Sequence, residues 1–226
     1  TMGANEAVSR VSYKFTEIAG IYPITPASPM AEKVDVLASK GEINFWGNKV
    51  KVIEMESEKG AIATVHGALQ AGVLATTYTA SQGLLLMIPS IYKMAGEMLP
   101  GVIHVAARSL STHSLSIFGD HQDIYAVRQT GACMLSSSSV EEAYHMAMVS
   151  HLASIKSSLP FINFFDGFRT SHEIDKVKEI DLSKLETLID KKALRKFRDN
   201  GMISGATTRG TAENEDVYFQ HTESRN

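Results

Sequence analysis

The chain has 226 residues, of which 44% are hydrophobic and 21% are charged, and its formal net charge is −3. This composition is that of an ordinary globular protein, and the small, mixed charge excludes a basic stripe for nucleic acid or a polybasic membrane patch. Cys133 is the single cysteine, which excludes an intrachain disulfide and a cysteine-ligated iron–sulfur or zinc site in these residues. The longest apolar run, residues 83–92, is about half as long as a membrane helix.

The first element is predicted to be a helix. Apolar residues recur at helical spacing from Asn5 to Ile18, and Gly20 follows where a helix would end. Three prolines then predict a rigid extended loop, since they forbid a regular strand ladder: Pro23, Pro26 and Pro29. This loop leads into a second helix near residues 31–39.

A strand followed by a helix then recurs along the middle of the chain. The predicted units are strand 49–55 with helix 58–72, strand 73–79 with helix 81–94, strand 102–107 with a polar loop, strand 132–135 with a helix to about residue 155, and a last strand 161–165. Ser57 can cap the first of these helices, and Ser139 with Glu142 forms a capping box before the last. Nearly continuous apolar strands that alternate with helices predict an α/β fold: a doubly wound, mostly parallel sheet with helices on both faces.

The chain changes character after about residue 181. Residues 182–198 are charged and predicted to be helical, and residues 200–226 are polar and contain little that could form a core. We therefore expect one α/β domain over residues 1–199 and a linker toward a missing second domain over residues 200–226.

Candidate site residues follow the predicted strands, because ligands of open parallel sheets bind beyond the carboxyl ends of the strands. These are Thr25 in the proline loop, Glu58, Ser81 with Gln82, and Arg108. Arg108 could bind a carboxylate through charge-assisted hydrogen bonds. Structural roles are also open: a charged first turn for Glu58, a salt bridge for Arg108, a turn for Thr25, and helix capping for Ser81 and Gln82.

Other polar groups are less specific. His121 with Asp120 and Asp123 suggests a metal or acid/base group, but the three are too close in sequence to close a site, and a helix-entry loop is favoured. Arg169 and His172 follow the last strand and fit a site, a surface or a subunit contact. Cys133 is expected to be buried and inert in its strand.

Six segments, in the same order, resemble the first domain of pyruvate:ferredoxin (flavodoxin) oxidoreductases: IYPITPASPMAE, EMESEKGAIATVHGAL, TYTASQGLLLMIPSIYK, HVAAR, LSIFGDHQDIYAVRQTG and PFINFFDGFRTSHE. The segment RGTAENEDVYFQ is similar to the family's run toward its second domain. The resemblance implies the pyrimidine-binding module of the thiamine diphosphate-binding fold. It implies oxidative decarboxylation of pyruvate with coenzyme A to acetyl-CoA and carbon dioxide.

The resemblance also implies roles for individual residues. The glutamate of the SE segment faces the aminopyrimidine ring, which selects Glu58 over Glu54 and Glu56. Thr25 and Arg108 match the family residues near pyruvate, and Thr25, Ser81 and Gln82 are expected to line the cofactor side. No metal ligand is expected in this chain, because it lacks the Gly-Asp-Gly signature for diphosphate and Mg²⁺.

The implied cofactor is thiamine diphosphate with Mg²⁺, shared with a missing domain, while [4Fe-4S] clusters and coenzyme A bind elsewhere in the full protein. The implied partners are the remaining domains, ferredoxin or flavodoxin, and a second subunit in a homodimer. The isolated chain is expected to be inactive, and the location to be the cytoplasm or, in an anaerobic protist, the hydrogenosome. Alternatives are a domain of another 2-oxoacid:ferredoxin oxidoreductase or a non-catalytic interaction module; a nucleotide-binding Rossmann domain is disfavoured because no GxGxxG follows the first strand.

Overall fold

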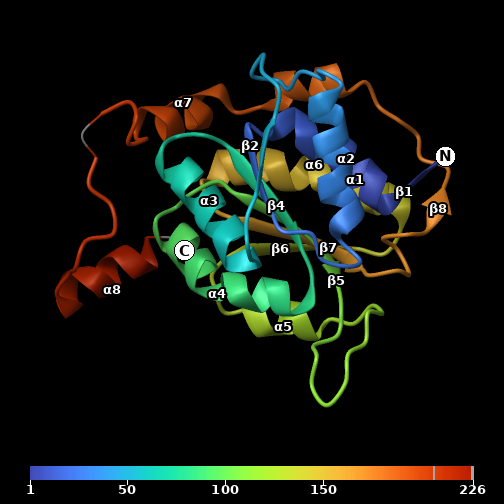
Figure 1. Cartoon of the computed structure of the whole chain (residues 1–226). Helices are drawn as coiled ribbons and strands as arrows, with labels where there is room; N and C mark the ends of the chain where they lie inside the picture. The colour runs from blue at the N-terminus through green and yellow to red at the C-terminus, as the bar shows by residue number, and fades with distance from the viewer. Residues whose placement is uncertain (206, 225–226) are drawn as a thin grey trace.

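A computed structural model describes residues 1–205 and 207–224, and its main sheet lies between two layers of helices (Figure 1). Six parallel strands form this sheet in the order β3-β2-β4-β5-β7-β6. The strands are β2 (Ile18–Ile21), β3 (Lys51–Glu54), β4 (Ala75–Thr79), β5 (Val102–Ala107), β6 (Cys133–Ser137) and β7 (Phe161–Asp166). The predicted α/β fold with a parallel sheet is confirmed.

Helices cover both faces of this sheet. On one face α1 (Ala4–Phe15) contacts α2 (Ser28–Ser39) and α6 (Val140–Ser157), and on the other α4 (Ser81–Gly96) contacts α3 (Glu58–Gln70) and α5 (Gln122–Val127). The central strands β4 and β5 are buried at every residue, because each faces helices on both sides. A separate antiparallel pair joins β1 (Met2–Gly3) to β8 (Ile174–Asp175).

The strand order creates a switch point between β2 and β4. The chain passes from β2 to β3 on one side and then crosses back over β2 to form β4 on the other. In open α/β sheets, loops that leave such neighbouring strands in opposite directions open a crevice for ligands. Here the proline loop after β2 and the turn after β4 flank that crevice.

The two predicted helix caps form in slightly different ways. The Ser57 hydroxyl accepts a hydrogen bond from the Gly60 amide at 3.3 Å, as expected for an N-cap. Ser139 accepts from the Glu142 amide at 3.2 Å, but the Glu142 carboxylate returns to the Ser138 amide at 2.8 Å rather than to Ser139. The reciprocal half of the capping box is therefore displaced by one residue.

The prediction for the first helix was wrong at its C-terminal end, because the structure has strand β2 there. The helix α1 ends at Phe15, and the next residue, Thr16, returns to an extended conformation. Ile18 continues the helical spacing of the apolar residues by coincidence, because a buried strand of only four residues has no periodicity of its own. Gly20 does not end a helix; it lies inside β2, paired with Ile53.

The C-terminal part also departs from expectation. The predicted helix 182–198 is divided into a 3₁₀ helix η1 (Leu182–Leu188) and α7 (Lys191–Asp199), because Asp190 accepts from two amides and starts a new helix. A further helix, α8 (Glu215–Glu223), lies where a linker is predicted, and none of its residues is buried. The predicted linker includes residues 206, 225 and 226, which lie outside the described residues. Its role as a linker stays a prediction.

No helix in the described ranges combines the length and the apolar character that crossing a bilayer requires.

Gly20 is required by close packing between β2 and α3. A Cβ built at Gly20 would lie 2.5 Å from the backbone oxygen of Ala61, which cannot move without shifting α3. We expect Gly20→Ala to lower the free energy of unfolding by about 1–3 kcal/mol. Gly67→Ala is the matched control, because Gly67 lies in α3 with open space around it; there alanine should stabilise by about 0.5–1 kcal/mol. Urea unfolding of both variants measures the difference, and equal stabilities would contradict this packing argument.

Candidate active site at the carboxyl edge of the sheet

The predicted site residues come together at the carboxyl edge of the sheet. Thr25 follows β2, Glu58 begins α3 after β3, Ser81 and Gln82 begin α4 after β4, and Arg108 follows β5. All four strands are parallel neighbours in the order β3-β2-β4-β5, so their ends share one edge.

Arg108 is a buried cation that reaches the proline loop. Only 6% of the residue is exposed, and its Nη1 donates to the backbone oxygen of Thr25 at 2.7 Å. Burial lowers the pKa of Arg108, whereas the nearby Asp123 carboxylate opposes this shift. The Arg108 Nε is buried and has no hydrogen-bond partner in the described part of the chain. A buried guanidinium with an unused donor suits an anionic ligand.

Glu58 lies against a wall formed by the start of α4. The residue is 7% exposed, and a Cβ built at Gly83 would lie 2.7 Å from its Oε1. The same Cβ would lie 2.6 Å from the hydroxyl of Thr79, so only glycine leaves room for both groups. The Thr79 hydroxyl is buried without a hydrogen-bond partner, and no hydrogen bond or ion pair reaches the Glu58 carboxylate from the described residues. The carboxylate is therefore held by packing and keeps its acceptor capacity.

The turn after β4 is linked by hydrogen bonds to the turn after β5. The Ser81 hydroxyl donates to the backbone oxygen of Ser109 at 2.6 Å, and the Gln82 amide nitrogen donates to the backbone oxygen of Ser111 at 3.0 Å. Neither side chain caps α4, whose N-cap is Ala80 without a side-chain bond. Because Ser81 is fully buried, it shapes this edge through the turn itself.

Asp123 is a residue of this edge that sequence reasoning did not assign. Its carboxylate is fully buried, and Oδ2 accepts from the amides of Ser81 at 2.7 Å and Arg108 at 3.0 Å. Oδ1 accepts from the amide of Ile124 at 2.8 Å. Burial raises the pKa of Asp123, while the three amides lower it. The sequence offered only its place near His121, which suggested a metal group.

The three side chains of that suggested metal group diverge. His121 pairs with Asp166 at 2.6 Å, Asp120 accepts from the Gln122 amide at 2.9 Å, and Asp123 turns inward. The helix-entry interpretation is confirmed, because α5 starts at Gln122. Among the residues described, no three His, Cys, Asp or Glu side chains gather as metal ligands.

The remaining candidates lie at the surface. Arg169 has a side chain that is 76% exposed and lies 4.0 Å from Asp166. His172 is exposed and stacks on Phe168, with ring centroids 4.7 Å apart. Cys133 was expected to be buried, but it is partly exposed because β6 is an edge strand; partial burial still raises the pKa of its thiol.

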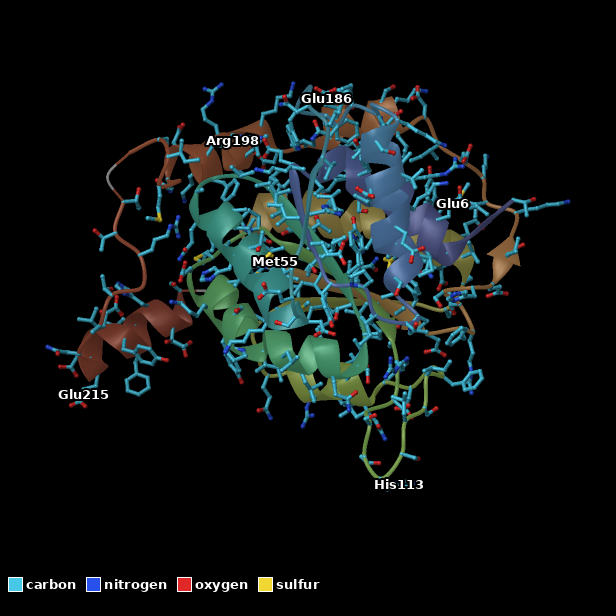
Figure 2. All side chains as sticks on the ribbon, viewed as in Figure 1. Glu6, Met55, His113, Glu186, Arg198 and Glu215 are labelled. Carbon is cyan, nitrogen blue, oxygen red and sulfur yellow. The ribbon has the colours of Figure 1, made fainter. Side chains whose placement is uncertain are left out.

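The carboxyl edge carries a projecting loop. Figure 2 shows His113 at the tip of the loop that follows β5, well away from the helices, and Arg198 on α7 at the other end of the molecule. Leu115 and Phe118 in this loop are 64% and 65% exposed. A hollow of about 310 Å³ lies beside Arg198 and Trp46, and its lining residues include none of the edge residues.

Comparison with known proteins gives the family. Residues 10–226 match the family described as "Pyruvate flavodoxin/ferredoxin oxidoreductase, thiamine diP-bdg". The chain is 57% identical to pyruvate-flavodoxin oxidoreductase of Klebsiella pneumoniae and 55% identical to pyruvate:ferredoxin oxidoreductase of Moorella thermoacetica, in both cases over its whole length. It is 50% identical over its whole length to the mitochondrial pyruvate dehydrogenase [NADP(+)] of Euglena gracilis. It spans 19%, 19% and 13% of these relatives.

A solved structure has the same fold. The 2-oxoglutarate:ferredoxin oxidoreductase of Magnetococcus marinus aligns with a TM-score of 0.65 and 24% identity over 75% of this chain and 30% of that chain. This likeness supports the fold, and the matches over nearly the full length of the sequence support the family. The chain therefore belongs to the thiamine diphosphate-binding domain family of the pyruvate flavodoxin/ferredoxin oxidoreductases.

Proposed function

We propose that this chain supplies the aminopyrimidine half of a thiamine diphosphate site, and part of the 2-oxoacid pocket, in a pyruvate:ferredoxin or pyruvate:flavodoxin oxidoreductase. The observation that carries the proposal is that one edge holds both the Glu58 carboxylate and the buried Nε of Arg108, and neither makes a hydrogen bond to any residue that the structure describes. The chain spans about a fifth of the Klebsiella and Moorella relatives. The diphosphate, Mg²⁺, [4Fe-4S] and coenzyme A sites would then lie in further polypeptide, and residues 200–226 would lead toward it.

The residues at this edge fit the aminopyrimidine side of the cofactor. The Thr79 hydroxyl is a buried polar group without a hydrogen-bond partner among residues 1–205 and 207–224, and Gly83 leaves a cradle beside Glu58 that any Cβ would fill. Glu58 is the group that would hold the ring and keep a proton at its nitrogen, with Ser81 and Gln82 shaping the wall behind it. Bound thiamine diphosphate supplies the carbon nucleophile and the electron sink for decarboxylation.

Arg108 and Thr25 would orient the 2-oxoacid. Arg108 donates to the Thr25 backbone, which fixes the guanidinium while leaving its Nε for a carboxylate. The Thr25 hydroxyl makes no hydrogen bond in the described structure, and Thr25 is exposed toward the edge. Orientation of the substrate before reaction is the contribution that such contacts make to the rate.

Other parts of the proposal concern the complete protein. We infer a homodimer in the cytoplasm, or in the hydrogenosome of an anaerobic protist. Ferredoxin and flavodoxin are named for different relatives, and NADP⁺ for the Euglena relative, so the acceptor depends on other domains. A related 2-oxoacid as substrate is the second candidate, and the rates of the complete enzyme with several oxoacids distinguish the two. The third candidate function is that of a non-catalytic interaction module. The exposed side chains of Leu115 and Phe118 favour this candidate.

The substrate role of Arg108 is tested in the complete oxidoreductase that contains this chain. Arg108→Ala is expected to raise the KM for pyruvate about 10- to 100-fold, since it removes a buried, charge-assisted contact. Arg169→Ala is the matched control, because that arginine is 76% exposed, and its KM should not change. Steady-state rates against pyruvate concentration provide the measurement. An Arg108→Ala enzyme with the wild-type KM would refute the pyruvate contact.

A further inference from the structure

The carboxyl edge contains a buried residue that joins its two functional turns. Asp123 comes from α5, yet a single oxygen, Oδ2, accepts from the amide that starts α4, Ser81, and from the amide of Arg108. The distances are 2.7 Å and 3.0 Å, and the residue is fully buried. Such a carboxylate ties the turn after β4 to the turn after β5.

The backbone of Ser81 has an uncommon conformation at this contact. Its φ is +52°, in the left-handed region that favours glycine, although Ser81 carries a side chain. Its amide points to Asp123, while its hydroxyl donates to the backbone of Ser109, one residue beyond Arg108. Non-glycine residues in this region persist where the surroundings hold them, and they gather at functional sites.

The joined turns carry the groups that position both halves of the proposed site. The turn after β4 leads directly to Gly83, which with Thr79 forms the wall against Glu58. The turn after β5 begins with Arg108, whose side chain reaches Thr25. Asp123 therefore lies behind the site, at the point that sets the position of the wall of Glu58 relative to Arg108.

We propose that Asp123 is a positioning residue, which sets the orientation of Arg108 toward the 2-oxoacid by joining the turns after β4 and β5. The proposal rests on the proposed function of the edge. Asp123 does not touch the substrate in this account; it acts through the backbone amides of Arg108 and Ser81.

The test uses the complete oxidoreductase with the variants Asp123→Ala, Asp123→Asn and Arg108→Ala, and the double variant Asp123→Asn with Arg108→Ala. Asp123→Ala is expected to raise the KM for pyruvate about tenfold. Asp123→Asn should give a smaller increase, because its one oxygen can still accept from Ser81 and Arg108. In the Arg108→Ala background, Asp123→Asn should not change the KM further, since coupled residues are not additive.

Asn44→Ala is the matched control for loss of structure. Asn44 is also buried, at 5% exposure, and it also makes three bonds to backbone groups: Thr16, Trp46 and Asn48. Asn44 precedes β3 at the amino edge of the sheet. The Asn44→Ala substitution should therefore lower stability in urea, as Asp123→Ala does, without changing the KM for pyruvate.

The outcomes separate the two proposals. If Arg108→Ala raises the KM but Asp123→Ala does not, Asp123 is no positioning residue and the proposed function stands. The same conclusion follows if the effects of Asp123→Asn and Arg108→Ala on the KM simply multiply, or if Asn44→Ala raises the KM as much as Asp123→Ala. If Arg108→Ala itself leaves the KM unchanged, the substrate contact fails and the role of Asp123 fails with it.

Discussion

Replacing Glu58 with glutamine is expected to lower the kcat of the complete oxidoreductase by about 100- to 10,000-fold, the usual range for a lost proton-transfer group. The glutamine has the same shape, so it keeps the packing against Gly83 and Thr79 while removing the negative charge. Stability should change little, because no hydrogen bond or ion pair in the described residues depends on that carboxylate. Acetyl-CoA formation under saturating pyruvate provides the measurement.

Two neighbouring glutamates are the matched controls. Glu54 and Glu56 lie within four residues of Glu58, but both are exposed, so Glu54→Gln and Glu56→Gln should retain wild-type kcat. A loss of activity in either of these variants, together with an active Glu58→Gln enzyme, would show that the role belongs to that neighbouring glutamate and not to Glu58.

Gly83→Ala examines the same carboxylate without removing its charge. The added Cβ would lie 2.7 Å from Oε1 and force the side chain of Glu58 to move. This variant should therefore also lose kcat, whereas Gly96→Ala in the last position of α4, where nothing lies within 4 Å, should not. An active Gly83→Ala enzyme would show that the position of Glu58 is not critical.

Local sequence signals were enough to predict the fold class and most strands. Strand β5 was predicted with its observed bounds, Val102–Ala107, because it is a short apolar run between a glycine and an arginine. The Ser57 cap likewise follows from adjacent residues. Strand β2 was missed because its identity depends on pairing with β3 and β4, more than 30 residues away in the chain. Propensity cannot report such pairing.

The residues of the candidate site differ in the same way: some could be predicted from neighbouring residues in the sequence, and others depend on contacts between distant segments. Arg108 could be selected because it directly follows a predicted strand, whereas Glu58 was separated from Glu54 and Glu56 only by the resemblance to a known family. The role of Asp123 could not, because its partners Ser81 and Arg108 lie 42 and 15 residues away. The role of Gly83 could not be predicted either, because its close approach to Glu58 exists only in the folded chain. Residues that position a site are harder to find than residues at strand ends, since their contacts exist only in the folded chain.

A buried pair of histidines is expected to make the stability of the fold strongly dependent on pH. His104 on β5 is 0% exposed and His151 on α6 is 5% exposed, and their Nε2 atoms lie 3.2 Å apart. The Asn163 amide nitrogen lies 3.1 Å from His104 Nδ1 and can donate to it. His104 would then carry its hydrogen on Nε2 and donate to His151. This chain of hydrogen bonds requires both rings to be neutral.

Burial opposes the charged form of both rings. It lowers the pKa of His104 to about 3, and burial together with the neighbouring His104 holds the pKa of His151 well below its usual value. The rings and amide around the pair are Phe15, Tyr78 and Asn163, none of which carries a compensating negative charge at neutral pH. Burial also raises the pKa of Tyr78, so that hydroxyl stays neutral.

The sign of the pH effect follows from these shifts. The unfolded chain binds a proton at each histidine near pH 6.5, whereas the folded chain does not until much lower pH. The stability is therefore fully present above about pH 6.5 and is lost as the pH falls toward the lowered pKa values. Between pH 6.5 and pH 5, the titration of His104 should reduce the free energy of unfolding by about 1.7 kcal/mol, and His151 should add to this loss in the same direction.

Urea unfolding at several pH values between 5 and 7.5 measures this loss, and a double variant isolates it. The double variant His104→Phe with His151→Phe lacks both titrating rings. Its free energy of unfolding should therefore fall less steeply than that of the wild type as the pH drops below 6.5. The two slopes should differ by at most about 2.7 kcal/mol per pH unit. His113→Gln is the control, because that histidine is exposed at the tip of the projecting loop and should keep the wild-type slope. The double variant is less stable at pH 7.5 if Asn163 is left without a partner, but this cost does not depend on pH. Equal slopes in the wild type and the double variant would mean that the pair can be protonated in the folded chain.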